Sequence, residues 1–242
     1  MILPRPQDAI HKMYLYRLLM AIIDDPALSR SLYFKGGTCA AMAGWLDRFS
    51  LDLDFDLAPK TNHALTRAVL RKTFSSCGLT IKQESKDGLF FILQYKAKEG
   101  ERNSLKCSVM TQVPAANQYE PLYLSDIKRY AVCQKKDTMV ANKLVAPLSR
   151  YEQYHTIAGR DIYDIHYFLS HGYVYRKEII AERRGVTAAV YIRELIAFIN
   201  RRVTDRTIVE DLNYLLPSAR FQITRNTLKE ETLMLLRTLL AA

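Results

Sequence analysis

Apolar residues along the first half of the chain follow two periods, and these separate expected helices from expected strands. A spacing of three to four residues is typical of amphipathic helices, and it occurs in the segments 8–26, 38–49 and 61–78. We expect the first helix to end at Pro26, Thr38 to cap the second, and Gly78 to end the third in a left-handed conformation.

Alternation of apolar and polar residues predicts strands between and after these helices. The expected strands lie in the segments 31–35, 48–57, 79–85, 89–97, 104–113 and 121–124. The pair Asp87-Gly88 stands between two of these strands, and such a pair between alternating runs is typical of a β-hairpin.

From about Ser125 onward the apolar spacing becomes helical and glycines become few. Helices are expected in the segments 135–150, 160–172, 187–202, 206–217 and 226–242. The pattern therefore predicts an α/β domain over residues 1–125 followed by an all-helical domain over residues 126–242. No low-complexity linker separates the two halves, so we expect the domains to pack closely.

Three aspartates alternate with apolar residues in the segment RFSLDLDFDL. Side chains of a strand point alternately to its two faces, so Asp52, Asp54 and Asp56 would share one face. Like charges at this spacing repel one another, and bound divalent cations would offset the repulsion. A pair of such ions can hold the attacking and leaving oxygens of a phosphoryl transfer. The pattern indicates a metal site, and the solvated face of an edge strand is the other interpretation.

A Gly-Gly pair precedes these aspartates. Gly36 and Gly37 follow an expected strand and precede an expected helix, where glycine lets backbone N–H groups approach phosphate oxygens. Strand, Gly-Gly, helix and D-x-D strand together form a plausible cradle for a triphosphate and its metal, although a Gly-Gly pair alone is usually an ordinary turn. A calcium-binding EF-hand loop is excluded, because Leu57 and His63 stand where that loop requires Gly and Glu.

Composition narrows the class of protein. The chain has 242 residues, of which 49% are hydrophobic and 25% charged, and these proportions are typical of a globular protein with one large or two ordinary domains. The four cysteines form no C-x-x-C pair, so neither a zinc site nor a disulfide framework is indicated. We find no signal sequence and no apolar run long enough to span a membrane, and we expect a cytoplasmic protein.

The charge of the chain bears on its partners. A formal net charge of +10 favours polyanions such as nucleic acid or nucleotide phosphates, and a basic, solvated surface without a partner is the alternative. The adjacent pairs Arg183-Arg184 and Arg201-Arg202 are candidate phosphate contacts or, equally, exposed residues of helices.

Two neighbouring motifs carry a resemblance to a known family. K-G-G-T at 35–38 and R-F-S-L-D-L-D-F at 48–55 resemble the signature of nucleotidyltransferases with the DNA polymerase β-like fold, and more narrowly the AbiEii family. That family comprises the toxins of type IV toxin–antitoxin systems and is related to the MenT toxins. Its lysine motif and its R-D-x-x-D motif have counterparts in ANKLVAPLSR, with Lys143, and GRDIYDI, with Asp161 and Asp164. The resemblance runs from about residue 34 to residue 166.

The resemblance implies a fold and an activity. The fold is a polymerase β-like catalytic domain, a mixed sheet flanked by helices, followed by an all-helical domain. The activity is the transfer of a nucleoside monophosphate from an NTP to an acceptor, which for MenT-type relatives is the 3′ end of tRNA. Such an enzyme inhibits translation and is neutralised by a cognate antitoxin.

The resemblance also implies roles for individual residues of the site. It assigns the triphosphate to Gly36, Gly37, Thr38 and Lys143, Mg²⁺ to Asp52 and Asp54, and the completion of the catalytic set, from the helical domain, to Lys143 and Asp161. Arg48, Ser50 and Asp164 occupy further motif positions and are secondary candidates, whereas Asp56 has no assigned role and is expected to be solvated or salt-bridged.

One position departs from the polymerase β-like pattern. Enzymes of that fold often carry a third carboxylate on a later strand, and here the expected position holds Ser108. Two other functions therefore stay open. A catalytically silent member would bind nucleotide or RNA as a regulatory module, and an antibiotic-type enzyme would use a small-molecule acceptor. Intact motifs favour an active enzyme, and the basic charge favours RNA as its acceptor.

Overall fold

The computed structural model describes residues 1–241, which divide into two compact units. The first unit comprises Met1–Val113 and Tyr119–Gln134, and the second comprises Pro114–Gln118 and the chain from Lys135 onward. The sequence pattern placed the domain boundary after residue 125. In the structure, a strand beyond that point continues the sheet of the first unit as far as Gln134.

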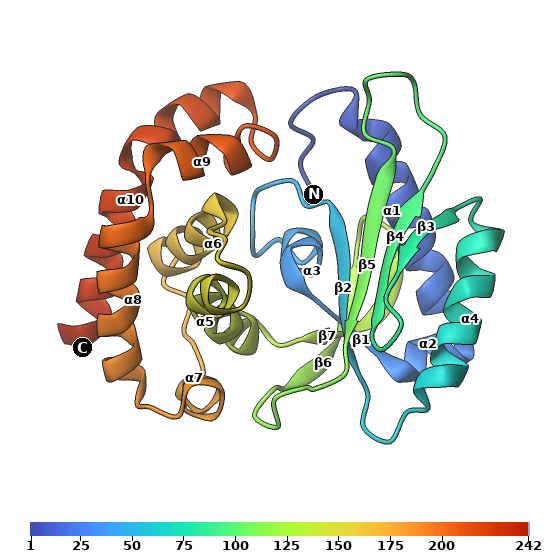
Figure 1. The fold of residues 1–242 in the computed structure, drawn as a ribbon, viewed down its shortest axis with the longest axis horizontal. Coiled ribbons are helices and arrows are strands. Elements are labelled where there is room, and N and C mark those ends of the chain that lie inside the picture. The colour runs from blue at the N-terminus through green and yellow to red at the C-terminus, as the bar shows by residue number, and fades with distance from the viewer. Residues whose placement is uncertain (242) are drawn as a thin grey trace. The chain divides into compact units, whose positions relative to one another are not determined.

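Within the described residues, the first unit contains one mixed sheet in the order β3-β4-β5-β2-β1-β7-β6 (Figure 1). The strands are β1 (Leu32–Lys35), β2 (Asp52–Leu57), β3 (Thr80–Glu84), β4 (Leu89–Gln94), β5 (Ser104–Met110), β6 (Tyr119–Leu124) and β7 (Arg129–Gln134). The pairs β2–β5 and β1–β7 are parallel, and the other neighbours are antiparallel. The aspartate strand β2 is therefore a central strand with a partner on each side.

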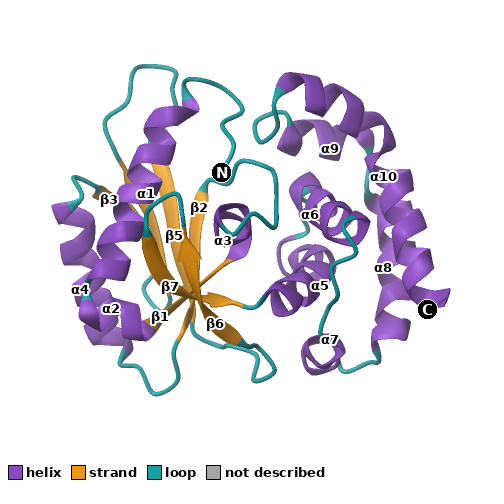
Figure 2. Cartoon of the chain, turned by 180° about the vertical axis from the view of Figure 1, so that it is seen from behind, coloured by secondary structure: helices purple, strands orange, loops and turns teal. Residues whose placement is uncertain are grey.

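Helices cover both faces of this sheet. They are α1 (Asp8–Asp24), α2 (Pro26–Ser31), α3 (Gly36–Met42) and α4 (His63–Ser76). Figures 1 and 2 show α1, α2 and α4 on one face and α3 on the other. Alternate strand residues such as Phe34, Phe55 and Phe91 are buried, and each contributes on the order of 1.5–3 kcal/mol of hydrophobic stabilisation. The same alternation turns the aspartates of β2 toward the face that carries α3.

Several local expectations are confirmed and several are wrong. Gly78 follows α4 with a φ of +71°, and β3 and β4 form the expected hairpin. Pro26 ends α1 but also begins α2, where the Asp25 side chain accepts hydrogen bonds from two backbone N–H groups of the first turn. Strand β7 was not expected, because its buried residues Ala131 and Cys133 are small and give a weak apolar signal.

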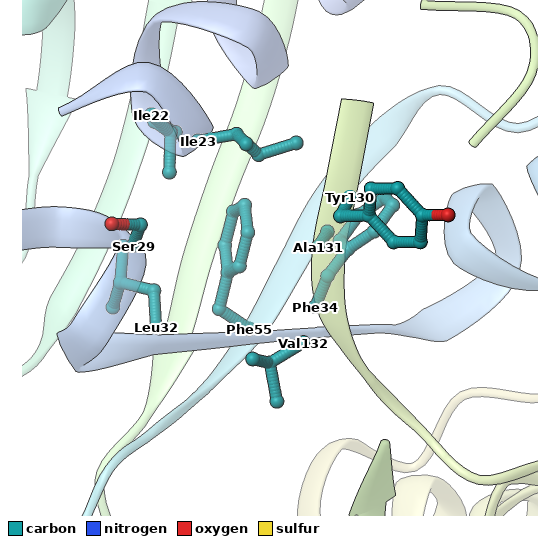
Figure 3. A pocket seen from close by; sticks show the side chains of 9 residues that line it. All are labelled: Ile22, Ile23, Ser29, Leu32, Phe34, Phe55, Tyr130, Ala131 and Val132. Carbon is teal, nitrogen blue, oxygen red and sulfur yellow. The ribbon is translucent and has the colours of Figure 1, made fainter. Parts of the chain in front are cut away.

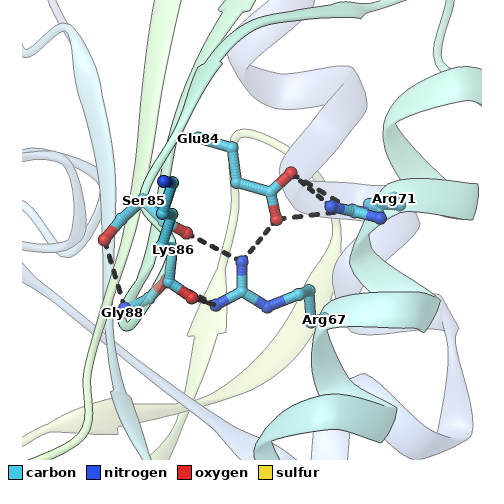
Figure 4. Close-up of polar contacts among 6 residues, drawn as sticks. All are labelled: Arg67, Arg71, Glu84, Ser85, Lys86 and Gly88. Atoms are coloured by element: carbon cyan, nitrogen blue, oxygen red, sulfur yellow. Dashed lines mark hydrogen bonds and ion pairs between the residues drawn. The ribbon is translucent and has the colours of Figure 1, made fainter.

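Arginine side chains of α4 brace the β3–β4 hairpin (Figure 4). Arg67 donates to the carbonyl oxygens of Ser85 at 2.9 Å and Gly88 at 2.8 Å, and its guanidinium also pairs with Glu84 at 2.5 Å. Arg71 pairs with the other carboxylate oxygen of Glu84 at 2.7 Å. Partial burial opposes ionisation of Glu84, but the two guanidiniums prevail and lower the pKa of this carboxyl below its usual value. The hairpin turn is thus fixed to the helix by backbone as well as side-chain acceptors.

The part of the second unit that begins at Lys135 is helical. Its helices are α5 (Lys136–Tyr154), α6 (Gly159–Ser170), α7 (Lys177–Arg184), α8 (Ala188–Arg202), α9 (Asp205–Leu212) and α10 (Ser218–Ala241). Helix α7 was not expected, and α10 begins eight residues before the expected start at 226. A Cβ atom at Gly159 would lie 2.6 Å from the Thr207 carbonyl oxygen, so glycine permits the close approach of α6 and α9. No helix within residues 1–241 combines the length and apolar character needed to cross a bilayer.

Candidate active site

The turn between β1 and α3 requires glycine at its first position. Gly36 has a φ of +79°, in the left-handed region that side chains disfavour. A Cβ atom there would also lie 2.7 Å from Oδ2 of Asp54. The backbone of the turn therefore lies directly against a carboxylate of β2.

Residues of the R-F-S motif pack directly against the second glycine, Gly37. A Cβ atom at Gly37 would lie 2.8 Å from Nη2 of Arg48 and 2.9 Å from Oγ of Ser50. Arg48 is only 2% exposed and donates to the Phe49 carbonyl oxygen at 2.9 Å. Arg48 and Ser50 thus pack the loop before β2 against the start of α3, so the two glycines and the R-F-S motif form one packed unit.

Thr38 connects the helix to the aspartate strand. The expectation that Thr38 caps an N-terminus is wrong, because α3 begins two residues earlier, at Gly36. Its hydroxyl instead donates to the Asp52 carbonyl oxygen at 2.5 Å. Thr38 is buried and therefore fixes the distance between α3 and the first residue of β2.

The three aspartates of β2 have three different environments. Asp52 lies beside Lys106 of β5, with 3.5 Å between Nζ and Oδ2, and its side chain is 31% exposed. Asp54 accepts a hydrogen bond of 2.5 Å from the Ser108 hydroxyl, also on β5. Both carboxylates are half-buried and share the face of the sheet that carries α3.

Asp56 is fully buried and engaged within the sheet. Lys35 of β1 forms an ion pair with Oδ1 of Asp56, and Oδ2 accepts from the Tyr119 hydroxyl at 2.7 Å and from Nε2 of Gln134 at 3.2 Å. Of the two expected environments, solvated or salt-bridged, the salt bridge is confirmed. Asp56 therefore joins β2 to β1, β6 and β7 and is not available as a metal ligand.

Ser108 lies where a third carboxylate was sought. Strand β5 pairs Ser108 with Asp54 in register, and its side chain supplies a neutral hydroxyl. Within residues 1–241, no group of three or more His, Cys, Asp or Glu side chains is placed to hold a metal ion. Cys107 of β5 is buried, and burial, followed by the nearby charges of Asp54 and Asp52, raises the pKa of its thiol well above the usual value, which disfavours the reactive thiolate. The oxygen donors on this face are thus Asp52 and Asp54.

A second cluster of charged side chains lies within the helical unit. Lys143 on α5 is 2.6 Å from Oδ2 of Asp164 and 3.8 Å from Oδ1 of Asp161, both on α6. Arg150, two turns after Lys143 on α5, is 2.9 Å from Oδ2 of Asp161. Both aspartates are buried, so the two cations offset the energetic penalty of placing carboxylates in the interior.

Sequence reasoning gave no role to five residues of these clusters: Lys35, Lys106, Tyr119, Gln134 and Arg150. Two of them could have been found from the periodicity of the sequence. Lys106 alternates with Ser108 and hence shares its face of β5, and Arg150 lies on the face of α5 that carries Lys143. Lys35 stands in the K-G-G-T motif, whereas Tyr119 and Gln134 gave no signal, because they lie on strands far from Asp56 in the sequence.

A small pocket in the first unit does not coincide with the aspartates (Figure 3). It has a volume of about 90 Å³ and lies among α1, α2 and the strands β1, β2 and β7. Its lining includes Ile22, Leu32, Phe34, Phe55 and Val132. Because Phe34 and Phe55 alternate with the polar residues of their strands, this pocket belongs to the apolar core and not to the charged face.

Comparisons with known proteins show the family of the chain. A sequence profile of the family "Nucleotidyl transferase AbiEii toxin, Type IV TA system" matches residues 17–231. No curated protein matches the sequence.

Solved structures show the same fold at low sequence identity. A candidate nucleotidyltransferase from H. pylori has a TM-score of 0.63 at 19% identity, over 98% of this chain and 96% of that one. JHP933 from Helicobacter pylori has a TM-score of 0.55 at 19% identity, over 97% and 94%. The nucleotidyltransferase toxin MenT4 from Mycobacterium tuberculosis H37Rv has a TM-score of 0.54 at 18% identity, over 95% and 84%.

The family match covers the Gly-Gly turn, the aspartate strand and the Lys143 cluster together. The mixed sheet flanked by helices, with a helical second unit, is the fold expected for such an enzyme. The chain is a nucleotidyltransferase and belongs to the AbiEii toxin family of type IV toxin–antitoxin systems.

Proposed function

We propose that this enzyme transfers a nucleoside monophosphate from an NTP to the 3′ end of tRNA in a Mg²⁺-dependent reaction that inhibits translation. The observation that carries the proposal is the contact between the Gly36 turn and the Asp54 carboxylate. It places backbone donors suited to phosphate beside oxygens suited to a hard cation.

The residues of β2 fit a magnesium ion. Asp52 and Asp54 are carboxylates two residues apart on one face, half-buried, and their oxygens are the donors that Mg²⁺ prefers. Mg²⁺ held there would neutralise charge on the triphosphate and orient the reacting oxygens. Asp56 is excluded from this role by its ion pair with Lys35.

The Gly-Gly turn is proposed to hold the triphosphate through its backbone. The absence of side chains at Gly36 and Gly37 lets Asp54, Arg48 and Ser50 lie directly against the turn, and backbone N–H groups of a glycine turn are suited to phosphate oxygens. The Thr38 hydroxyl is engaged with the Asp52 carbonyl oxygen, so Thr38 contributes to nucleotide binding by fixing the turn. Arg48 and Ser50 support the same turn from the other side.

Lys143 is proposed to stabilise charge that develops on the leaving pyrophosphate. Asp164 holds the ammonium group at 2.6 Å, and Asp161 is held in turn by Arg150. Such positioning is useful in catalysis because an oriented cation needs little reorganisation in the transition state. Asp161 and Asp164 are accordingly proposed as positioning residues for Lys143.

RNA is the proposed acceptor because the chain carries a net charge of +10. The candidate arginines differ in availability. Arg184 is occupied by both carboxylate oxygens of Glu152, each at 2.7 Å, whereas Arg201 is exposed at the end of α8. Arg201 is therefore the better candidate for a phosphate contact.

A labelling experiment tests the proposed reaction. The full chain is incubated with Mg²⁺, total RNA and each labelled NTP in turn, with Asp54→Asn as the matched control. Label in tRNA that depends on Mg²⁺ and disappears with Asp54→Asn supports the proposal. Label confined to small molecules would indicate an antibiotic-type acceptor, and a folded protein that binds nucleotide without any transfer would indicate a regulatory module.

The proposed toxicity and its neutralisation have a separate test in cells. Induced expression of the wild-type chain should arrest bacterial growth, and expression of Asp54→Asn at the same level should not. Co-expression of the cognate antitoxin should restore growth. Continued growth with active wild-type enzyme would contradict the role as a toxin.

A further inference from the structure

Helix α5 contains a proline between Lys143 and Arg150, the two cations that pair with α6. Lys143, Pro147 and Arg150 follow helical spacing, so they lie along the face of α5 that meets the aspartates of α6. Pro147 is buried and has no backbone N–H. In a regular helix, the amide at this position would donate to the carbonyl oxygen of Lys143, four residues earlier. Pro147 removes that hydrogen bond, and its ring crowds the same carbonyl group.

A side chain of α8 reaches the same turn of α5. The Tyr191 hydroxyl donates to the carbonyl oxygen of Leu144 at 2.9 Å, and both residues are fully buried. A helix bends at a proline or where a side chain enters its backbone hydrogen-bond ladder. Here the two causes act on consecutive carbonyl groups, those of Lys143 and Leu144. The backbone direction of α5 is therefore set at the turn that carries Lys143.

Tyr191 is itself held in one position. Burial raises the pKa of its hydroxyl above the usual value, so the group stays protonated and donates. The Arg184 guanidinium lies 5.4 Å from the centre of the Tyr191 ring, within the range of a cation–π contact. Both carboxylate oxygens of Glu152, near the end of α5, accept from Arg184 at 2.7 Å. Tyr191 thus contacts α5 directly and is fixed by a residue that is also paired with α5.

We propose that Pro147 and Tyr191 are positioning residues for Lys143 in the transfer reaction. The inference rests on the proposed function, because it assumes that Lys143 stabilises charge on the leaving pyrophosphate. Asp164 holds Nζ of Lys143 at 2.6 Å, while Pro147 and Tyr191 fix the backbone from which this side chain starts. A small displacement of such a cation lowers the rate more than the affinity for substrate, because the charge that it stabilises develops in the transition state.

The two residues predict that stability and rate change independently. Pro147→Ala restores the amide of a regular helix, so the temperature of unfolding should stay the same or rise. Tyr191→Phe removes the donor from the buried Leu144 carbonyl group, so the temperature of unfolding should fall. Both variants should nevertheless lose kcat by on the order of tenfold with KM for NTP unchanged, because both release the turn that carries Lys143.

The experiment measures transfer of labelled NMP from the NTP to total RNA by the full chain in Mg²⁺, and thermal unfolding in the same buffer. Thr232→Val is the matched control for Tyr191→Phe. Thr232 is also fully buried, and its hydroxyl donates to a backbone carbonyl oxygen, that of Leu228 on α10, at 2.6 Å. Thr232→Val should lose stability and keep the wild-type kcat.

Three results would overturn the positioning role. They are a wild-type kcat in Pro147→Ala or in Tyr191→Phe, a rise of KM in place of the fall in kcat, and a loss of kcat in Thr232→Val as large as in Tyr191→Phe. Lys143→Ala is measured alongside, since a wild-type kcat in that variant would overturn the role of Lys143 itself. The failure of the proposed function is thereby distinguished from the failure of this inference.

Discussion

The aspartates of β2 show how one residue type serves two purposes on one face of a strand. Asp52 and Asp54 are half-buried and lie beside a lysine and a serine, whereas Asp56 is buried in an ion pair with Lys35. Repulsion among the three is relieved locally, since Lys35 and Lys106 each stand beside one end of the row. The two half-buried members are the proposed metal ligands, and the buried member holds the sheet together.

The same substitution at two positions of β2 should therefore have very different effects on stability. Asp56→Asn removes the charge that partners Lys35 and should lower the free energy of unfolding by roughly 2–3 kcal/mol, because one member of a largely buried pair is left behind. Asp52→Asn should change it by less than about 0.5 kcal/mol, since its pair with Lys106 is partly exposed. Urea unfolding of both variants measures the difference, and equal losses would contradict the structural role of Asp56.

Lys143 offers a prediction about activity. Lys143→Arg keeps the positive charge beside the buried Asp164 and should preserve the fold. Its planar guanidinium does not reproduce a compact ammonium, so kcat should fall by roughly 10–100-fold with little change in nucleotide affinity. Lys143→Ala should lose about 10²–10³ in rate. Measurements of kcat and KM for NTP test this, and wild-type kcat in Lys143→Ala would remove Lys143 from the catalytic set.

Sequence reasoning identified the motif residues but not the side chains that contact them. Alternation alone placed Asp52 and Asp54 on one face of β2, and the structure agrees. It could not locate the partners of Asp56, because Tyr119 and Gln134 are polar residues on strands whose pairing depends on the whole sheet. Local periodicity reports which face a residue occupies and does not report which strand lies next to it.

At the scale of elements, the turn before α3 requires glycine for two separate reasons. Gly36 combines a left-handed φ with a Cβ position only 2.7 Å from Asp54. Gly44, after the same helix, has a similar φ of +72° but no heavy atom within 4 Å of its Cβ position. A comparison of Gly36 with Gly44 therefore separates the effect of the strained backbone from the effect of the contact with the Asp54 carboxylate.

Gly36→Ala and Gly44→Ala should accordingly differ in activity. Both should lose about 1–2 kcal/mol of stability from the left-handed backbone. Gly36→Ala should in addition displace the Asp54 carboxylate and weaken nucleotide binding by at least about tenfold, whereas Gly44→Ala should bind nucleotide like the wild type. Thermal unfolding and nucleotide titration of the two variants measure both effects. Equal nucleotide affinity would show that the close approach at Gly36 does not matter for the site.

The connection between α1 and β2 predicts a pH dependence. His11 of α1 is buried between the Tyr95 hydroxyl at 2.7 Å and the Leu51 carbonyl oxygen at 2.9 Å, directly before the aspartate strand. Burial lowers the pKa of His11 from 6.5 to about 4. The unfolded chain therefore binds more protons than the folded chain between pH 4 and pH 6.5, so stability is full above pH 6.5 and falls as the pH drops through this window.

The size of this loss should be on the order of 2–3 kcal/mol at pH 4. His11→Gln keeps a polar side chain but cannot titrate, so its stability should be flatter over the same window. Urea unfolding at several pH values compares the two proteins. Parallel pH profiles for the wild type and His11→Gln would show that other groups cause the loss.

The elements that sequence reasoning missed share a physical cause. Strand β7 buries the small residues Ala131 and Cys133, and helix α7 is a short element of eight residues. Both are stabilised by their neighbours more than by their own pattern, since β7 pairs with β1 and β6. Long amphipathic segments such as α5 and α8 were found because their periodicity is repeated over several turns.

At the scale of the whole molecule, the net charge of +10 predicts salt-dependent binding of RNA. Log affinity should fall linearly with log salt, by roughly 0.7–0.9 for each phosphate contact. Arg201→Glu should weaken RNA binding and reduce the slope by about one contact while leaving NTP binding nearly unchanged. Arg202→Glu is a close companion, since Arg202 is also exposed but lies 5.2 Å from the Tyr151 ring.

Arg184→Glu serves as the contrasting variant in this experiment. It places a carboxylate against Glu152 and should lower stability, with no specific change in the salt slope. Filter binding measures the RNA affinity of all three variants at salt concentrations from about 50 to 300 mM. This range includes physiological ionic strength. An unchanged slope in both Arg201→Glu and Arg202→Glu would show that RNA docks elsewhere.

The order of strands in the sheet also bears on when a growing chain becomes an enzyme. Strand β1 pairs with β2 early in the sequence, but its other edge waits for β7, and Asp56 receives Gln134 only with that strand. A nascent chain folds as its segments leave the ribosome, so the inner edge of β1 stays open until residue 134 has emerged. Fragments that end earlier carry the complete Gly-Gly and D-x-D motifs without the sheet that positions them. Under the proposed function, a nascent chain therefore gains transfer activity only after residue 134 has emerged.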